Sequence, residues 1–343
     1  MKKIIYYVTD HGLGHATRSV ALIRELQKYN LEIIVRNSNA KHFLKNSLEH
    51  TRIVSDKTDV GPLIKNDGIS INETKSKPII KEWIDSIEEY ATLESTRLLK
   101  MKPDLIISDI SPMPFLAAKK LGITSVAISN FTWYDVLKFL PKNQLCRLGE
   151  IYSLADFTIQ LPFGTSMNIF RKKKKVGLVS RKRTKSKQQI KKELGIDSSF
   201  RIVLVALGGS KHSLKFKTDD KTVILSMNSR ISDKHNVIDV TNWIEGQDLV
   251  SISDLVICKC GYGFVSECIS NRIPFFYLLD SKHREQNAIS KQLSKMKLGK
   301  KISLNQLNNL EFNEKFFLGL SKTRKIHLEN QKTAHAILKL IEK

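Results

Sequence analysis

The sequence has few of the residues that mark fibrous, disulfide-linked or membrane-spanning chains. Its 343 residues include 4 cysteines, 8 prolines and 16 glycines, which excludes a collagen-like or proline-rich disordered chain. No apolar run approaches the roughly 18–20 residues that a membrane span needs, and the apolar stretch near the N-terminus is too short for a signal peptide. We therefore expect a cytoplasmic globular protein.

The scarcity of cysteine also bears on metal chemistry. Cys258, Cys260 and Cys268 cluster in ICKCGYGFVSEC, and Cys146 stands apart. This cluster has neither the spacing nor the histidine partners of a zinc site. We expect small buried apolar residues in a reducing compartment, with no metal and no cofactor.

Positive charge, in contrast, is abundant and unevenly spread. Lys and Arg number 57 against 34 Asp and Glu, giving a net charge of +23. Residues 171–192 contain 12 of these cations and no acid. Such a run repels itself and cannot bury an apolar face, which predicts an exposed connection between two halves of the chain. It is either a solvated linker or a contact for a phosphate-bearing partner, anionic lipid or nucleic acid.

Short apolar blocks alternate with amphipathic stretches along the whole chain, in which 41% of residues are hydrophobic. Helices are predicted near 16–28, 113–121, 264–271 and 285–296. The blocks between them are predicted to be strands, at 3–9, 31–36, 104–109, 124–129, 156–160, 201–207, 222–227, 236–240, 254–258 and 274–279.

Continuously apolar strands separated by helices are typical of parallel sheets covered on both faces. We predict an α/β protein of two doubly wound, Rossmann-like domains facing a central cleft, with ligands at the carboxyl ends of the strands. The N-terminal domain is expected over 1–170, and a basic linker with a connecting helix over 171–198. The C-terminal domain is expected over 199–343 and includes a helical tail.

The first strand is followed by a glycine-rich turn, DHGLGHATR, in which a helix begins. Gly12 and Gly14 allow close approach of the backbone to a ligand, and the helix start offers free N–H groups to an anion. His15 is predicted to be a general base, the alternatives being ligand orientation and a structural role. His11 is a further candidate, and Arg18 could hold an acid or a phosphate.

Two other turns of the first half carry polar candidates. Asp109 ends strand 104–109 and could assist a base, or cap the helix that starts near Met113. Asn130 and Trp133 follow the next strand and offer an amide and an aromatic wall to a hydroxyl-rich ligand.

The second half has two turns suited to phosphate. Residues 208–210 follow strand 201–207, and Gly261 with Tyr262 opens a helix after strand 254–258. Glu267, one turn into that helix, can accept hydrogen bonds from ribose hydroxyls or merely complement the helix dipole. Glu285 and Gln286, at another helix start, are typical of a sugar-binding edge.

The strings HGLGHATR, SDISPMPFLAAKKLGITSVAISNFTW, DLVICKCGYGFVSECISNRIPFFYLL and REQNA together resemble the GT-B superfamily of nucleotide-sugar glycosyltransferases. The nearest resemblance is to the glycosyltransferase-like N-terminal half of L-arabinokinases, and a more distant one is to the peptidoglycan-precursor N-acetylglucosaminyltransferases. It covers roughly residues 3–165 and 200–300. Since no kinase domain follows residue 343, arabinokinase activity is not expected.

The resemblance implies a role for each candidate. His15 would be the base, and Ile244 would contact the nucleobase through its backbone. Glu267 would bind the ribose. The remaining donor contacts would be to the sugar, through Glu285 and Gln286, and to the diphosphate, through Gly208, Gly209, Ser210, Gly261 and Tyr262.

The function expected from these roles is inverting, metal-independent transfer of a sugar from a nucleotide donor, a UDP-sugar, to an acceptor. The acceptor, a sugar, lipid-linked glycan or protein, is left open. Peripheral contact with the anionic inner face of a membrane is compatible with the basic run. The alternatives are a nucleotide-sugar hydrolase on the same fold and a non-catalytic binder of nucleotide sugar or nucleic acid.

Overall fold

The structure, a computed structural model, describes residues 1–66, 69–208, 213–232 and 236–342. The chain divides into two compact units. Unit 1 comprises residues 1–63, 72–180 and 328–343, and unit 2 comprises residues 64–71 and 181–327. Each unit is built on its own parallel sheet.

Unit 1 contains a sheet of seven described strands in the order β3-β2-β1-β4-β5-β6-β7, all paired in parallel. The chain turns in opposite directions from β1 and β4, which makes these neighbours the switch point of a doubly wound sheet. The strands are β1 (Lys2–Val8), β2 (Leu31–Arg36), β3 (Arg52–Val54), β4 (Leu105–Asp109), β5 (Ser125–Ser129), β6 (Phe157–Gln160) and β7 (Lys173–Lys175).

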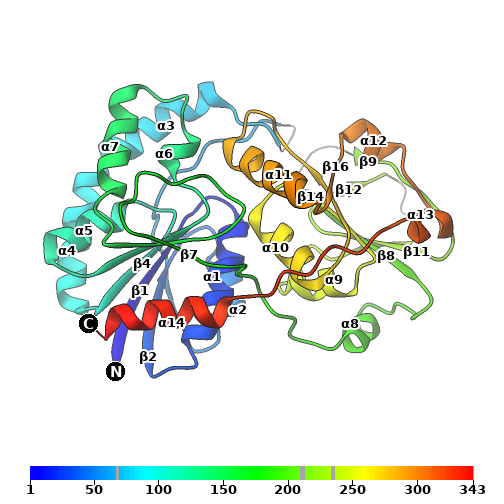
Figure 1. The fold of residues 1–343 in the computed structure, drawn as a ribbon, viewed down its shortest axis with the longest axis horizontal. Coiled ribbons are helices and arrows are strands. Elements are labelled where there is room, and N and C mark those ends of the chain that lie inside the picture. Colours follow the sequence, from blue (N-terminus) through cyan, green and yellow to red (C-terminus); the bar gives the residue numbers. More distant parts are fainter. Residues whose placement is uncertain (67–68, 209–212, 233–235, 343) are drawn as a thin grey trace. The chain divides into compact units, whose positions relative to one another are not determined.

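The helices of unit 1 connect and cover these strands (Figure 1). They are α1 (Leu13–Leu26), α2 (Lys41–Ser47), α3 (Glu73–Asp85), α4 (Ile87–Met101), α5 (Met113–Leu121), α6 (Trp133–Val136), α7 (Lys142–Tyr152) and α14 (Asn330–Ile341).

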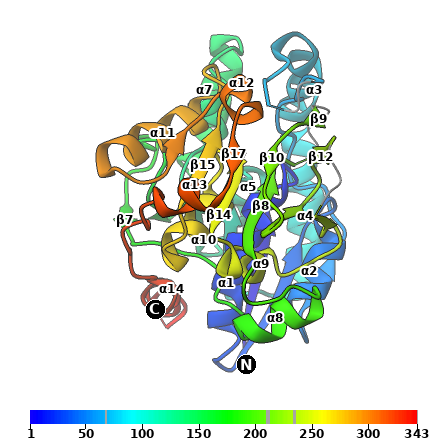
Figure 2. The ribbon, with the colours of Figure 1, turned by 90° about the vertical axis from the view of Figure 1, so that its right-hand side faces the viewer.

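Unit 2 repeats the architecture with six described strands in the order β13-β11-β8-β14-β15-β16, again parallel. Its switch point is the pair β8 and β14, and β15 is the next strand after β14 (Figure 2). The strands are β8 (Arg201–Ala206), β11 (Thr222–Ser226), β13 (Val237–Asp239), β14 (Leu255–Lys259), β15 (Phe275–Leu278) and β16 (Lys300–Lys301).

Two short parallel pairs supplement the main sheet of unit 2. They join β9 (Ser213–Leu214) to β12 (Arg230–Ile231), and β10 (Lys217–Thr218) to β17 (Glu311–Phe312). The helices of this unit are α8 (Lys187–Glu193), α9 (Gly246–Ile252), α10 (Tyr262–Asn271), α11 (Arg284–Met296), α12 (Leu304–Asn308) and α13 (Glu314–Leu318).

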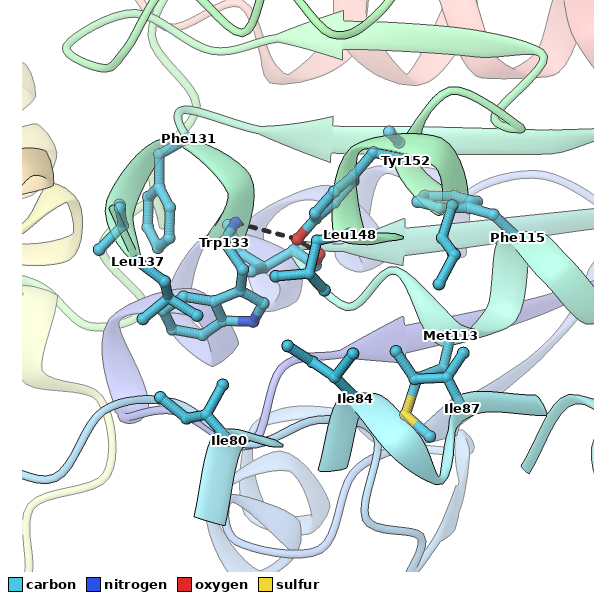
Figure 3. Close-up of a cluster of buried hydrophobic side chains, with 14 of the residues drawn as sticks. Ile80, Ile84, Ile87, Met113, Phe115, Phe131, Trp133, Leu137, Leu148 and Tyr152 are labelled. Carbon is cyan, nitrogen blue, oxygen red and sulfur yellow. Dashed lines mark hydrogen bonds between the residues drawn. The ribbon is translucent and has the colours of Figure 1, made fainter. Parts of the chain in front are cut away.

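One hydrophobic cluster of the unit 1 core is built largely from side chains of the β5–α6 turn, α3, α5 and α7 (Figure 3). Phe131 and Trp133 pack edge to face, with ring centroids 5.4 Å apart. The hydroxyl of Tyr152 accepts a hydrogen bond from the backbone N–H of Trp133 and donates one to the Ile110 carbonyl. This polar pairing satisfies the Tyr152 hydroxyl inside an otherwise apolar cluster.

The structure corrects the expected domain limits at the C-terminus. The tail, predicted within the C-terminal domain, returns to unit 1, where α14 packs against α1 (Figure 1). Asn330, the first residue of α14, exchanges two hydrogen bonds with the backbone of Ser180, and Glu329 accepts one from the N–H of Gly177. These bonds satisfy backbone groups of a buried connecting segment, which is the physical reason for the return.

The basic segment 171–192 is also more structured than the expected exposed linker. Lys173–Lys175 form β7 at the edge of the unit 1 sheet, where lysines discourage pairing with further strands. Leu178 and Val179 are buried. The boundary between the two units falls inside this segment, between residues 180 and 181.

Candidate functional site

The first candidate feature is the turn between β1 and α1, at the switch point of the unit 1 sheet. Helix α1 begins at Leu13, after Gly12, whose φ of 78° is a left-handed conformation that glycine adopts without strain. Since Gly12 has no side chain, the first-turn N–H groups of α1 receive no side-chain cap there. This arrangement suits an anionic or partly negative ligand group.

His15 lies in the first turn of α1, beside the carboxylate that ends β4. Its Nδ1 is 3.5 Å from Oδ1 of Asp109, and its ring packs edge to face with Phe131, centroids 5.5 Å apart. His15 is 7% exposed and Asp109 is fully buried. The β1–β4 pairing therefore brings a histidine and a carboxylate together at the carboxyl edge of the sheet.

Arg18, one turn further along α1, binds the same carboxylate. Its Nε and Nη2 donate to the two oxygens of Asp109 at 2.7 and 2.5 Å, and Nη1 donates to the amide oxygen of Asn130. The hydroxyl of Ser19 also donates to Asp109, at 3.2 Å. Burial alone would raise the pKa of Asp109, but Arg18 with further help from His15 holds that pKa below its usual value. Asp109 is thus a carboxylate at neutral pH.

Asp109 does not cap the following helix, because Pro112 occupies the N-cap position of α5. Asn130 and Trp133, expected as a ligand wall, are fully buried. The amide of Asn130 is held by Arg18 and by the carbonyl of Phe163. Burial of both residues corrects the expectation of a ligand wall. Asn130 and Trp133 pack inside unit 1 and present no surface to a ligand.

A second buried carboxylate, Asp59, was not identified from the sequence. It accepts hydrogen bonds from Thr9 Oγ1 at 2.8 Å, from the backbone N–H of Asp10 at 2.9 Å and from Trp133 Nε1 at 2.8 Å. Burial raises the pKa of Asp59 to about 6, although these hydrogen bonds partly oppose the shift. The sequence around Asp59 has neither an apolar periodicity nor a pair of glycines, so it gives no signal of a site. The tertiary contacts of Asp59 with the end of β1 identify it as a candidate.

His11 is placed by the same cluster. Its ring meets the indole of Trp133 edge to face at 5.3 Å between centroids. A Cβ atom at Gly61 would lie 2.1 Å from Nδ1 of His11. The backbone at residue 61 is therefore so close to the His11 ring that a larger residue would clash with it. Asp59, Trp133 and Gly61 therefore fix where His11 lies.

In unit 2, Gly208 follows β8 with a φ of 59°. The ammonium group of Lys259, the last residue of β14, donates to its carbonyl at 3.1 Å. Lys259 therefore places a cation at the predicted diphosphate turn. This residue was not predicted from the sequence, although its position two residues before Gly261 indicated that it ends the strand next to that turn. Gly209 and Ser210 lie outside the described residues.

Helix α10 begins at Tyr262 after Gly261, so its first turn likewise has no side-chain cap. Glu267, further along α10, is buried, and its Oε1 accepts a hydrogen bond from Nε of Arg181 at 2.9 Å. Arg181 also donates to the carbonyl of Ile244 at 3.2 Å. One arginine from the basic segment thus joins the two groups expected to meet the nucleoside.

Burial raises the pKa of Glu267, and Arg181 reduces that shift. The carboxylates of Glu245 and Asp248 add to the rise. Glu267 therefore depends on Arg181 to carry its charge in a buried position.

Glu285 and Gln286 lie in the first turn of α11, as expected. The side-chain oxygen of Gln286 accepts a hydrogen bond from the backbone N–H of Asp280 at 2.8 Å. Asp280 in turn accepts one from the N–H of Ile71 at 3.1 Å. Gln286 therefore braces the loop before α11, and Glu285 is buried beside it.

Among the described residues, no group of three or more His, Cys, Asp or Glu side chains is arranged to hold a metal ion. Cys258, Cys260 and Cys268 are buried thiols, and burial raises the pKa of each. None of the described helices has both the length and the apolar character that crossing a bilayer requires.

Comparison with known proteins gives a family match for the first half of the chain. Residues 2–160 match the family described as Glycosyl transferase family 1. An L-arabinokinase of Arabidopsis thaliana is 27% identical over 288 residues, which cover 80% of this chain. The matched region is 28% of that protein's length, so the chain spans less than a third of this relative.

Solved structures of similar fold include a UDP-glucosyltransferase from Polygonum tinctorium and MurG from Acinetobacter baumannii. The UDP-glucosyltransferase has a TM-score of 0.63 and 11% sequence identity, and the match covers 100% of this chain and 99% of that protein's chain. MurG has a TM-score of 0.55 and 14% sequence identity, and the match covers 100% of this chain and 99% of the MurG chain. The expected α/β fold of GT-B type is confirmed, and the resemblance to glycosyltransferases with it.

Proposed function

We propose that this protein transfers a sugar from a nucleoside diphosphate donor, a UDP-sugar, to an acceptor hydroxyl with inversion at the anomeric carbon. The observation that carries the proposal is the His15–Asp109 pair. It lies at the switch point of the sheet in the region that matches a glycosyltransferase family.

His15 is proposed as the general base. Asp109, ionised and fixed by Arg18, faces Nδ1 of His15 and would hold the proton on that nitrogen. Nε2 would then accept the acceptor's hydroxyl proton as the acceptor oxygen attacks the anomeric carbon. The bond between that carbon and the diphosphate oxygen breaks, and the nucleoside diphosphate leaves.

The leaving diphosphate gains negative charge as this bond breaks. In unit 2, the backbone near Gly208 and Gly261, the uncapped start of α10 and the ammonium group of Lys259 are suited to stabilise that charge. These groups supply the electrostatic stabilisation for which a metal is otherwise used, and we propose that none is required. Gly209 and Ser210 remain proposed members of this turn.

Glu267 and Ile244 are proposed to bind the nucleoside, with Arg181 holding both in place. Glu285 and Gln286 are proposed to bind the donor sugar. A uridine nucleotide is favoured because the structural neighbours include a protein named as a UDP-glucosyltransferase. The acceptor side is proposed to include His11, Gly12, Gly14 and Arg18.

The decisive experiment is product analysis with candidate UDP-sugars and a panel of acceptors. Transfer predicts a glycosylated product and slow release of free sugar in the absence of acceptor. Rapid release of free sugar at a rate that no acceptor increases would contradict transfer. The protein would then be a nucleotide-sugar hydrolase in which His15 activates water.

Donor identity can be screened first by thermal unfolding. A nucleotide present at 100 times its dissociation constant raises the free energy of unfolding by about 2.7 kcal/mol. Absence of any shift across nucleoside diphosphates and their sugars would contradict the donor assignment.

We also propose a cytoplasmic location with peripheral attachment to an anionic membrane surface through the exposed cations around β7. Arg171, Lys172, Lys174 and Lys175 are exposed, whereas Lys173 donates to the carbonyl of Ser166. Clustered exposed cations attract anionic lipid.

A further inference from the structure

Unit 2 has a pocket of about 640 Å³ at the edge of its sheet opposite to Gly208 and Gly261. It is lined by residues at or just before the starts of three strands, Arg201 of β8, Asp254 before β14 and Pro274 before β15. The proposed donor turns follow the carboxyl ends of β8 and β14. The pocket is therefore separated from those turns by the length of the sheet.

The charges that line the pocket are predominantly positive. Five cations contribute, Lys187 and Lys191 of α8, Arg201, Arg272 at the end of α10, and Lys322. The lining contains one carboxylate, that of Asp254. This carboxylate accepts a hydrogen bond from the backbone N–H of Ile202 at 2.9 Å and pairs with Nη1 of Arg201 at 3.3 Å. The negative charge of Asp254 is thus already paired with groups of the protein itself.

The effect of this imbalance is visible at Lys187. Desolvation lowers the pKa of Lys187, and the positive charge of Arg183 lowers it further. Lys191 and Lys322 act in the same direction, whereas Asp254 opposes them. The protein thus holds several like charges close together with Asp254 as their partial internal compensation, an arrangement that a bound anion relieves.

The remaining lining gives the pocket a defined shape. Phe200, Ile273, Phe317 and Leu320 form apolar walls, and the guanidinium group of Arg201 lies 5.9 Å from the centre of the Phe317 ring. An aromatic ring at this distance attracts a guanidinium group and helps to orient it, while Nη1 of Arg201 pairs with Asp254. Ser198 and Ser199 also line the pocket.

We propose that this pocket is a second ligand site of the protein, which binds a soluble, multiply charged phosphate compound. Its volume suits a small phosphorylated molecule, and its cations come from several segments that the fold brings together. Two of these cations, Lys187 and Lys191, belong to the basic segment 171–192, and the proposed transfer reaction gives neither of these two lysines a role. The site is independent of the proposed donor site and does not rest on it.

The test uses inorganic tripolyphosphate, titrated calorimetrically into the full chain at about 0.15 M salt. The pocket variant is Lys191→Gln/Lys322→Gln. The matched control is Lys291→Gln/Lys295→Gln, which removes the same charge from exposed positions on α11 that do not line the pocket. The pocket variant should bind tripolyphosphate at least about tenfold more weakly, because the loss of even one of its two charge-assisted hydrogen bonds has about that effect, and the control should match the wild type.

Two further measurements separate this site from others. Saturating UDP should leave tripolyphosphate binding unchanged; displacement by UDP would place the anion in the donor site and overturn the proposal. Equal weakening in both variants would also overturn it, because general charge attraction would then suffice.

A last arm addresses the source of the phosphate. Sedimentation with phosphatidylglycerol vesicles should be the same for the pocket variant and its control. If the pocket variant alone loses vesicle binding while tripolyphosphate does not bind, the residues contact a membrane and the soluble-ligand proposal fails. Thermal unfolding of both variants verifies that each is folded.

Discussion

At the scale of single residues, His15 decides whether the proposed chemistry takes place. Replacing it by Ala removes the proposed base and should lower turnover by about 10²–10⁴-fold while donor affinity is retained, because the proposed donor contacts belong to unit 2. Turnover and nucleotide affinity measured on the same preparation test this.

The control is His42→Ala, an exposed histidine on α2. It should behave as the wild type. Near-normal turnover in His15→Ala would exclude the base role and leave Asp109 as the next candidate.

Glu267, the proposed ribose ligand, should affect donor binding more than the rate of the chemical step, because the ribose does not react. Glu267→Gln keeps the size of the side chain but weakens a charge-assisted hydrogen bond, worth roughly 1.5–3 kcal/mol. The dissociation constant or KM for the donor should rise about 10- to 100-fold, with kcat changed little.

Glu193→Gln on α8 serves as the exposed control on the same unit. Arg181→Gln should resemble Glu267→Gln, since it leaves the buried carboxylate without its partner. An unchanged KM in the folded Glu267 variant would contradict the ribose assignment.

Asp59 makes the stability of the protein depend on pH. Its pKa of about 6 in the folded state lies above the unfolded value of 3.8, so the folded state holds the proton more tightly. Between those two values the unfolded chain binds fewer protons than the folded one, and the free energy of unfolding falls as the pH rises. The full effect of a shift of about two units is about 3 kcal/mol.

Urea unfolding of the wild type and Asp59→Asn at several pH values between about 4 and about 7 measures this contribution. The stability of the wild type relative to the variant should decline with rising pH. A difference between the two proteins that is constant across this range would show that Asp59 does not titrate there.

At the scale of secondary-structure elements, the side chain of Asn330 ties α14 to the segment that ends unit 1 at residue 180. Asn330 pairs with both the N–H and the carbonyl of Ser180, which is buried. Asn330→Ala leaves both backbone groups without that partner and should lower the free energy of unfolding by about 1–3 kcal/mol. Urea unfolding gives the value, and the exposed neighbour Gln331→Ala should show almost no change.

At the scale of the whole molecule, the net charge of +23 makes any membrane contact strongly dependent on salt. Replacing the exposed cations of the β7 edge, Arg171, Lys172, Lys174 and Lys175, by Gln should reduce sedimentation with anionic vesicles. Higher salt should weaken binding of the wild type, because the Debye length at about 0.15 M is about 8 Å.

The charge-matched control replaces Lys45, Lys100, Lys119 and Lys142, which are exposed elsewhere on unit 1. It should sediment as the wild type does. Arg181 is kept in both variants, since it is bound to Glu267 and its loss would disturb the proposed donor site. Equal sedimentation of both variants would refute attachment through the β7 edge.

Prediction from the sequence succeeded where local signals suffice. The ten predicted strands are present in the two sheets, and helices begin at the glycine turns near Gly12 and Gly261. Strands β3, β7 and β16 and the four short described strands outside the main sheets were not predicted, because two or three residues are too few to carry an apolar pattern. The limits of the two units were missed for a similar reason, since the return of α14 depends on contacts far along the chain.

By itself, the sequence determined the two parallel sheets and the positions of their glycine turns, because apolar blocks and glycine conformations act over a few residues. Only the tertiary structure decided which charges meet. Arg18 and Asp109 are 91 positions apart, Arg181 and Glu267 are 86 apart, and Asp59 reaches Trp133 across 74. Such pairs form because strand order places distant segments side by side, and burial then makes each charge or N–H group depend on a partner.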